Sequence, residues 1–191
     1  MISKKKVFII GGICILIATI LTSIILIRKK NMKSIKNNKQ ITNNDYDVIL
    51  MGGLDNRKGD KNISEQVSLL KKNANNKKII GYRYNDISGV KEMIKKYPNA
   101  IVVLFSAGAS YSSVIAELIT NKNKLFIVEP YATSSNVTKS VKDAVSQGVP
   151  NKNVITGASI SRGKGVVEEA TKTPTEIGHW GALEFTGNLL K

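Results

Sequence analysis

The chain has 191 residues and a formal net charge of +15, which is room for one soluble domain and an appendage. The excess charge is uneven. Residues 1–44 hold nine Lys or Arg and no acid, so residues 45–191 hold 29 − 9 = 20 basic and 14 acidic groups, a net +6. The second region has no basic stripe interleaved with aromatic residues, and we therefore expect no nucleic-acid partner.

Metal and cofactor chemistry are also not expected. The chain has one histidine, His179, and one cysteine, Cys14, which lies in an apolar stretch near the N-terminus. These leave residues 45–191 without a usual zinc ligand set, a disulfide or a reactive thiolate. The glycine pair at residues 52–53 is not followed by Gly-Lys-Ser/Thr, and no G-x-G-x-x-G is present there. The sequence therefore predicts a protein without a cofactor.

Residues 1–30 are expected to form an N-terminal transmembrane anchor. Residues 7–27 are 21 residues without a charge, framed by cations at residues 4–6 and 28–30. About 20 apolar residues cross a bilayer as a helix. The run continues into cations, without a small-x-small cleavage site, so an uncleaved signal-anchor is expected. The protein is then a single-pass membrane protein. Counting cations favours a cytoplasmic domain, whereas many short Lys-rich anchors insert the other way, and the side stays open.

Residues 31–44 are polar, rich in Lys and Asn, and lack apolar periodicity, so they are expected to be a linker. From residue 45 to residue 191, strand and helix patterns alternate. Strands are predicted over residues 47–51, 78–84, 100–105, 125–128 and 153–156, and helices over residues 62–72, 88–96, 111–119, 136–147 and 180–190. Such alternation predicts an α/β three-layer sandwich, with a mainly parallel sheet of five to six strands between helices. Ligands bind beyond the carboxyl ends of the strands in these sheets.

One of these strand ends carries a serine in a distinctive setting. The apolar run at residues 100–105 gives way to Ser106 and then to Ala107, Gly108 and Ala109 before a helix. A strand, a tight turn with serine and a helix make a nucleophile elbow, in which small neighbours let the two backbones approach. The pattern G-x-S-x-G is met in part, because Leu104 stands in the place of the first glycine. A plain turn between strand and helix is the alternative.

His179 follows the last predicted strand and precedes the last predicted helix, between Gly178 and Gly181. A single histidine is often only structural. A serine hydrolase on an open α/β sheet, however, needs its base in such a position downstream of the serine. Imidazole suits this role because it can take up and return a proton near neutral pH.

The order of these residues resembles that of the α/β hydrolases, in particular the small lidless esterases and cutinase-like lipases. The resemblance covers nearly all of residues 45–191. It implies that Ser106 is the nucleophile and His179 the general base. It also implies an oxyanion hole built from the amide of Ala107 and an amide of the loop after the first strand, at Gly53 or Leu54.

The acid of the triad is where the sequence departs from this family. The loop after residues 153–156, where the acid usually lies, has no carboxylate. Glu129, one strand earlier, is the candidate, and a surface or capping charge is its alternative reading. Three other carboxylates, Glu168, Glu169 and Glu176, are poorer candidates in helical or irregular segments. A Ser-His dyad, with Ser159 or a backbone carbonyl holding the ring, is also open.

Two further features lie near these residues. The segment 162–165, Arg-Gly-Lys-Gly, could cradle an anion or be a solvated loop. Trp180 could line the pocket or hold the last helix on the sheet. The sequence thus predicts a membrane-anchored serine hydrolase that acts on a small-molecule or lipid-like ester through an acyl-enzyme. The alternative is a non-catalytic, membrane-tethered α/β binding module with a degenerate hydrolase fold. The oligomeric state is not predicted.

Overall fold

The structure is a computed structural model, and it describes residues 45–55, 58–157 and 159–190. The expected anchor (1–30) and linker (31–44) lie outside the described residues. Within the described residues, no helix is both long and apolar enough to cross a membrane. Asp45–Lys191 forms a compact unit of its own.

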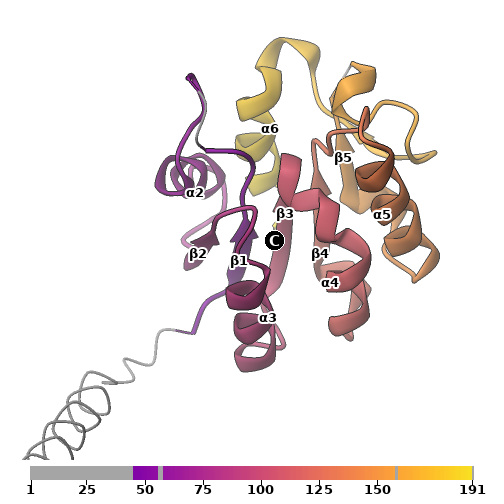
Figure 1. Cartoon of the computed structure of the whole chain (residues 1–191). Helices are drawn as coiled ribbons and strands as arrows, with labels where there is room; N and C mark the ends of the chain where they lie inside the picture. Colours follow the sequence, from indigo (N-terminus) through magenta and orange to yellow (C-terminus); the bar gives the residue numbers. More distant parts are fainter. Residues whose placement is uncertain (1–44, 56–57, 158, 191) are drawn as a thin grey trace, which may run out of the picture. The chain divides into compact units, whose positions relative to one another are not determined.

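The unit is built on a six-stranded sheet in the order β2-β1-β3-β4-β5-β6, in which every neighbouring pair is parallel (Figure 1). The strands are β1 (Val48–Met51), β2 (Ile79–Tyr82), β3 (Ile101–Phe105), β4 (Leu125–Val128), β5 (Val154–Thr156) and β6 (Thr171–Lys172). The sequence was expected to give a mainly parallel α/β sheet, and this is confirmed. Because all strands run the same way, all their carboxyl ends lie at one edge of the sheet.

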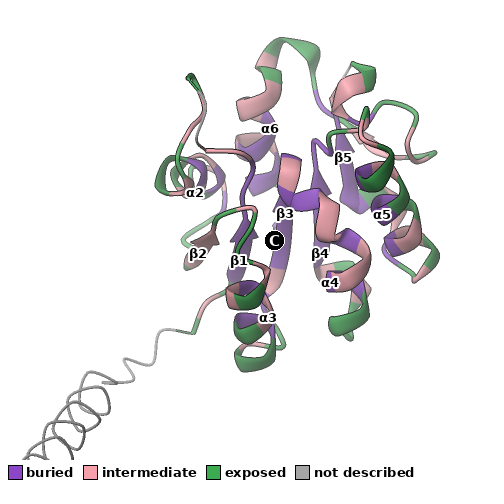
Figure 2. Ribbon diagram, in the orientation of Figure 1, coloured by how far each residue is buried: buried purple, intermediate pink, exposed green. Residues whose placement is uncertain are grey.

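Helices cover both faces of the sheet. They are α2 (Ile63–Lys71), α3 (Ile87–Lys96), α4 (Ser112–Leu118), α5 (Ser135–Ser146) and α6 (Gly178–Gly187). Successive residues of a strand point to opposite faces. In β1, Ile49 and Met51 pack into a cluster with buried residues of α3, α4 and α5, whereas Val48 and Leu50 pack with α2 and α6. Strands β1, β3, β4 and β5 are therefore buried on both faces, as the purple ribbons of Figure 2 show, whereas the edge strands β2 and β6 are partly exposed.

Local signals set the helix starts. The side chain of Asn62 accepts a hydrogen bond from Glu65 N, and Glu65 Oε2 accepts one from Asn62 N, which is a capping box. Helix α3 begins one residue before the predicted Ser88, because Asp86 Oδ1 accepts a hydrogen bond from Gly89 N at 3.0 Å. A side-chain oxygen at this position satisfies an amide that the helix leaves without a partner.

Two features near the C-terminus differ from the prediction. Strand β6 has only two residues, Thr171 and Lys172, and no apolar run from which it could be predicted. Helix α6 begins at Gly178, so His179 lies in the first turn of a helix and not in the loop before it. Gly178 has φ +63°, a value that favours glycine and permits the sharp entry into this helix.

The strand order reverses between β1 and β3, since the chain builds outward from this pair in both directions. Open α/β sheets bind ligands in the crevice at such a switch point, outside the carboxyl ends of the strands. A ligand site is therefore expected at the loops after β1 and β3. Ser106 is the first residue after β3.

Candidate active site

A cavity of about 440 Å³ lies at the carboxyl edge of the sheet. The segment that follows each of the six strands contributes to its lining. In strand order β1 to β6, these contributions include Leu54, Tyr84, Ser106, Tyr131, Arg162 and His179. Ser106 and His179 are 73 residues apart by number and line one cavity, together with Ala107 and Trp180. This is the position at which the fold class predicts a ligand site.

Ser106 has the backbone of a sharp strand-to-helix turn. Its φ is +52°, in the left-handed region that costs an L-residue roughly 1–2 kcal/mol. It begins a 3₁₀ helix, Ser106–Tyr111, that leads into α4. A Cβ placed on Gly108 would come within 2.7 Å of Met51 O, so the turn lies directly against the end of β1. The small residues after Ser106 are thus required by a close approach of two backbones.

The loop after β1 packs against Ser106. A Cβ on Gly53 would lie 2.9 Å from Ser106 Cβ and 3.3 Å from its Oγ. Gly53 N donates a buried hydrogen bond of 2.8 Å to Gln66 Oε1 of α2. Of the two residues expected to supply an oxyanion donor here, Gly53 already uses its N–H in this bond. Leu54, which lines the cavity, keeps the candidate role.

The other expected oxyanion donor is the amide of Ala107. Ala107 lines the cavity and is the second residue of the 3₁₀ helix that Ser106 begins. The first N–H groups of a helix have no partner within it. The amide of the residue after a nucleophilic serine is the position from which an elbow stabilises an oxyanion.

His179 packs against two aromatic rings, Phe105 and Trp180, which also contact each other at a centroid distance of 5.5 Å. Its ring stacks on Phe105 with a centroid distance of 4.6 Å and an interplanar angle of 25°, and its centroid lies 5.1 Å from that of Trp180. Phe105 is fully buried and directly precedes Ser106 in the chain. The stacking therefore fixes the imidazole beside the strand end that carries the serine.

Glu129 contacts the same imidazole from the end of β4. Its Oε2 lies 3.3 Å from His179 Nδ1, and its side chain is 2% exposed. Its φ is +49°, so Glu129 repeats at β4 the left-handed backbone that Ser106 has at β3. The other carboxylates considered, Glu168, Glu169 and Glu176, are exposed and do not line the cavity.

This contact gives the ring a defined proton arrangement. An ionised carboxylate can only accept, so when Glu129 is ionised Nδ1–H donates to it, and the lone pair of a neutral imidazole is then on Nε2. Among the described residues, no hydrogen bond joins Ser106 Oγ to His179. Such bonds are often long in a free enzyme and shorten when substrate binds. The arrangement suits a base that takes a proton from a group in the cavity.

Ser159 was the other group considered for holding the ring. Its Oγ lies 2.9 Å from Ser161 Oγ, and this pair is exposed to solvent. The orientation of His179 is thus set by Glu129, Phe105 and Trp180. A smaller cavity, of about 280 Å³, lies beside Glu129 and Gly157, and the buried Glu129 Oε1 has no hydrogen-bond partner in the described part of the chain.

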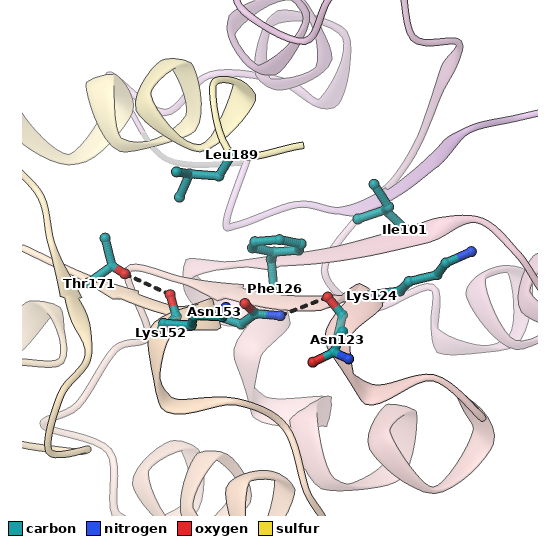
Figure 3. Close-up of a pocket in the computed structure, with 8 residues that line it drawn as sticks. All are labelled: Ile101, Asn123, Lys124, Phe126, Lys152, Asn153, Thr171 and Leu189. Carbon is teal, nitrogen blue, oxygen red and sulfur yellow. Dashed lines mark hydrogen bonds between the residues drawn. The ribbon is translucent and has the colours of Figure 1, made fainter. Parts of the chain in front are cut away.

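A different cavity, of about 510 Å³, lies at the opposite edge of the sheet, around the amino ends of β3 to β6 (Figure 3). Its polar groups bind one another: Asn153 Nδ2 donates to Asn123 O at 2.9 Å, and Thr171 Oγ1 donates to Lys152 O at 2.7 Å. These bonds close the turns at the strand starts. Its lining contains neither a carboxylate nor a histidine.

Metal ligands do not gather in the described residues, where no group of three or more His, Cys, Asp or Glu side chains could hold an ion. What the fold and the site define is a parallel α/β protein with a Ser, His and Glu constellation at the carboxyl edge of its sheet. Comparison with protein-family models, curated proteins and solved structures finds no match for this chain. The functional argument therefore rests on the geometry.

Proposed function

We propose that this protein is a membrane-anchored serine hydrolase of the α/β type, which cleaves an ester through an acyl-enzyme. The observation that carries the proposal is the partly buried contact of 3.3 Å between Glu129 Oε2 and His179 Nδ1, since His179 lines the same cavity as Ser106. Glu129 follows β4 and His179 follows β6, and the two residues are 50 positions apart in the chain, so no local structure brings them together. The chain order serine, acid, histidine is that of the α/β hydrolases.

In this mechanism Ser106 Oγ attacks the ester carbonyl carbon while His179 Nε2 accepts the hydroxyl proton. Glu129 stabilises the imidazolium that forms. The amides of Leu54 and Ala107 donate to the oxyanion. The carbon–oxygen bond of the ester then breaks, and His179 gives its proton to the departing alcohol. A water molecule, activated by the same imidazole, attacks the acyl-enzyme and releases the acid and Ser106.

Membrane attachment rests on residues 7–27, whose length and lack of charge match a spanning helix. An anchored hydrolase acts on esters close to a membrane surface. The side of the membrane is not part of the proposal.

A fluorophosphonate probe tests the hydrolase. It forms a covalent bond only with a serine that a nearby base activates. We expect the full-length protein to be labelled and Ser106→Ala to lose all labelling. Ser110→Ala is the matched control, because Ser110 lines the same cavity but its Oγ donates to Ala107 O at 2.8 Å. Labelling of Ser106→Ala, or no labelling of the folded wild-type protein, would favour the binding module instead.

A further inference from the structure

Arg162 is a cation in the wall of the candidate active-site cavity that the proposed mechanism does not use. It ends the short 3₁₀ helix Ile160–Arg162, after β5, and is half-buried. Its side chain also lines the smaller cavity next to Glu129. It therefore lies close to the groups that would carry out the reaction.

The backbone at this position is held in place. Arg162 O accepts a hydrogen bond from Gly157 N at 3.2 Å, and Ser161 O accepts one from Ala132 N at 3.2 Å. The next residue, Gly163, has φ +90°, and a Cβ there would come within 2.9 Å of Pro130 and Thr156. The loop after β5 is thus fixed against the loop after β4. The backbone position of Arg162, from which its side chain extends, is therefore well defined.

No ion pair within the described part of the chain includes Arg162. The ion pairs there are Lys72–Glu184, Arg83–Asp55, Lys139–Asp143 and His179–Glu129. Asp60 also lines the cavity. A guanidinium without an ion pair donates its hydrogen bonds to solvent in a cavity that is open to water. A ligand that displaces this water must offer an acceptor, or it leaves the cation desolvated at a cost.

Guanidinium is a planar fork of donors that matches the geometry of carboxylate and phosphate groups. A neutral alkyl ester would fill the cavity without offering the Arg162 guanidinium an anionic acceptor. An ester that carries a second, anionic group would offer one. The remaining lining supports a compact polar ligand, since it includes the hydroxyl side chains of Tyr84, Tyr131 and Ser134. A cavity of about 440 Å³ is at the small end of ligand sites.

We infer that Arg162 is a specificity-determining residue and that the substrate is a small ester that also carries a carboxylate or a phosphate. This inference rests on the proposed hydrolase function for its reaction, but the binding preference that it predicts does not require turnover. It also narrows the expected substrate class from lipid-like esters to acidic ones.

Trp180 provides a direct readout, because it is the only tryptophan of the chain and it lines this cavity. The experiment uses the full-length Ser106→Ala protein, which cannot form an acyl-enzyme. Its intrinsic fluorescence is titrated with monomethyl succinate and with dimethyl succinate, which differ in one negative charge. A second pair of ligands, the carboxyl methyl ester of phosphonoacetic acid and the neutral trimethyl phosphonoacetate, is titrated in the same way. Comparison of the two pairs shows whether the site prefers a phosphonate or a carboxylate. We expect the anionic member of at least one pair to bind roughly tenfold tighter or more.

Adding Arg162→Gln should abolish this preference, and Arg162→Lys should retain part of it, since lysine keeps the charge and loses the fork. Lys164→Gln is the matched control: it removes the same charge from the same loop, but Lys164 is exposed and lines neither cavity. Equal binding of charged and neutral esters, or a preference that survives Arg162→Gln in a protein with an unchanged melting temperature, would overturn the inference. The hydrolase proposal fails separately. In that case the wild-type protein is not labelled by the fluorophosphonate but still binds the anionic ester more tightly than the neutral one.

Discussion

Two residues, Ser106 and Glu129, adopt a left-handed backbone at the first position after a central strand. Each pays roughly 1–2 kcal/mol for this conformation. Such strain persists only where the surrounding structure determines it, and it is concentrated at functional sites. Both side chains are directed by these turns to the edge where His179 lies: one lines its cavity and the other contacts its ring. The backbone conformation of Ser106 and Glu129 therefore supports their proposed roles as nucleophile and acid, as the side-chain contacts do.

Glu129→Gln tests the acid at this scale. The amide keeps the size of the side chain but removes the negative charge that would stabilise the imidazolium. We expect the rate of fluorophosphonate labelling of Ser106 to fall roughly 10²- to 10⁴-fold, while the far-ultraviolet circular dichroism stays unchanged. The rate is measured by stopping the labelling reaction at a series of times.

The matched control for this change is Glu176→Gln. Glu176 is close to His179 in sequence but is exposed, at the 3₁₀ helix Thr175–Ile177. Its substitution should leave the labelling rate within about twofold of wild type, since surface changes away from a site have small effects. If Glu129→Gln labelled as fast as wild type, a Ser-His dyad would replace the triad.

At the scale of secondary-structure elements, helix α2 sets the shape of the loop that carries Leu54. Gln66 of this helix is fully buried, accepts the Gly53 N–H at 2.8 Å, and donates through Nε2 to Lys61 O at 2.7 Å. On the other side of Leu54 in the chain, Arg83 Nε lies 2.8 Å from Asp55 Oδ2. This hydrogen bond raises the pKa of the Arg83 guanidinium. The candidate oxyanion donor is thus supported on both sides.

Gln66→Met should damage both stability and reactivity. Methionine fills a similar volume but leaves the buried Gly53 N–H without its acceptor, which costs about 1–3 kcal/mol of unfolding free energy. Labelling of Ser106 should slow as well, because Leu54 loses its support. Chemical denaturation and the labelling time course measure the two effects. Ser68→Ala, an exposed change in the same helix, should shift the unfolding free energy by less than about 0.5 kcal/mol. A Gln66→Met protein as stable as wild type would show that this bond does not hold the loop.

For the whole molecule, the sequence allowed the sheet and the edge that bears the site to be predicted, because buried parallel strands are apolar runs. β4 begins and ends at the predicted residues 125 and 128. Strand β6 could not be predicted, since its Thr171 and Lys172 pair only through backbone at a sheet edge. The Glu129–His179 contact spans 50 residues, and whether Arg162 meets a carboxylate among the described residues depends on the three-dimensional arrangement of the loops. Such properties depend on how loops fold together, which no local pattern encodes.

The division of charge and hydrophobicity along the chain predicts two separable parts. Asp45–Lys191 is a compact unit of its own that contains two hydrophobic clusters on the sheet, so residues 45–191 should fold without residues 1–44. We expect the full chain, expressed in cells, to sediment with membranes on ultracentrifugation. A chain of residues 45–191 should remain in the supernatant and be labelled at Ser106.

The control is the full chain with Ile15→Lys and Ile17→Lys. Each substitution costs about 2.5–3.5 kcal/mol at the centre of a spanning helix, so the pair should release the protein from the membrane. A wild-type chain in the supernatant would remove the anchor from the proposal and leave the hydrolase untouched, whereas an unfolded 45–191 chain would mean that the N-terminal residues contribute to the fold.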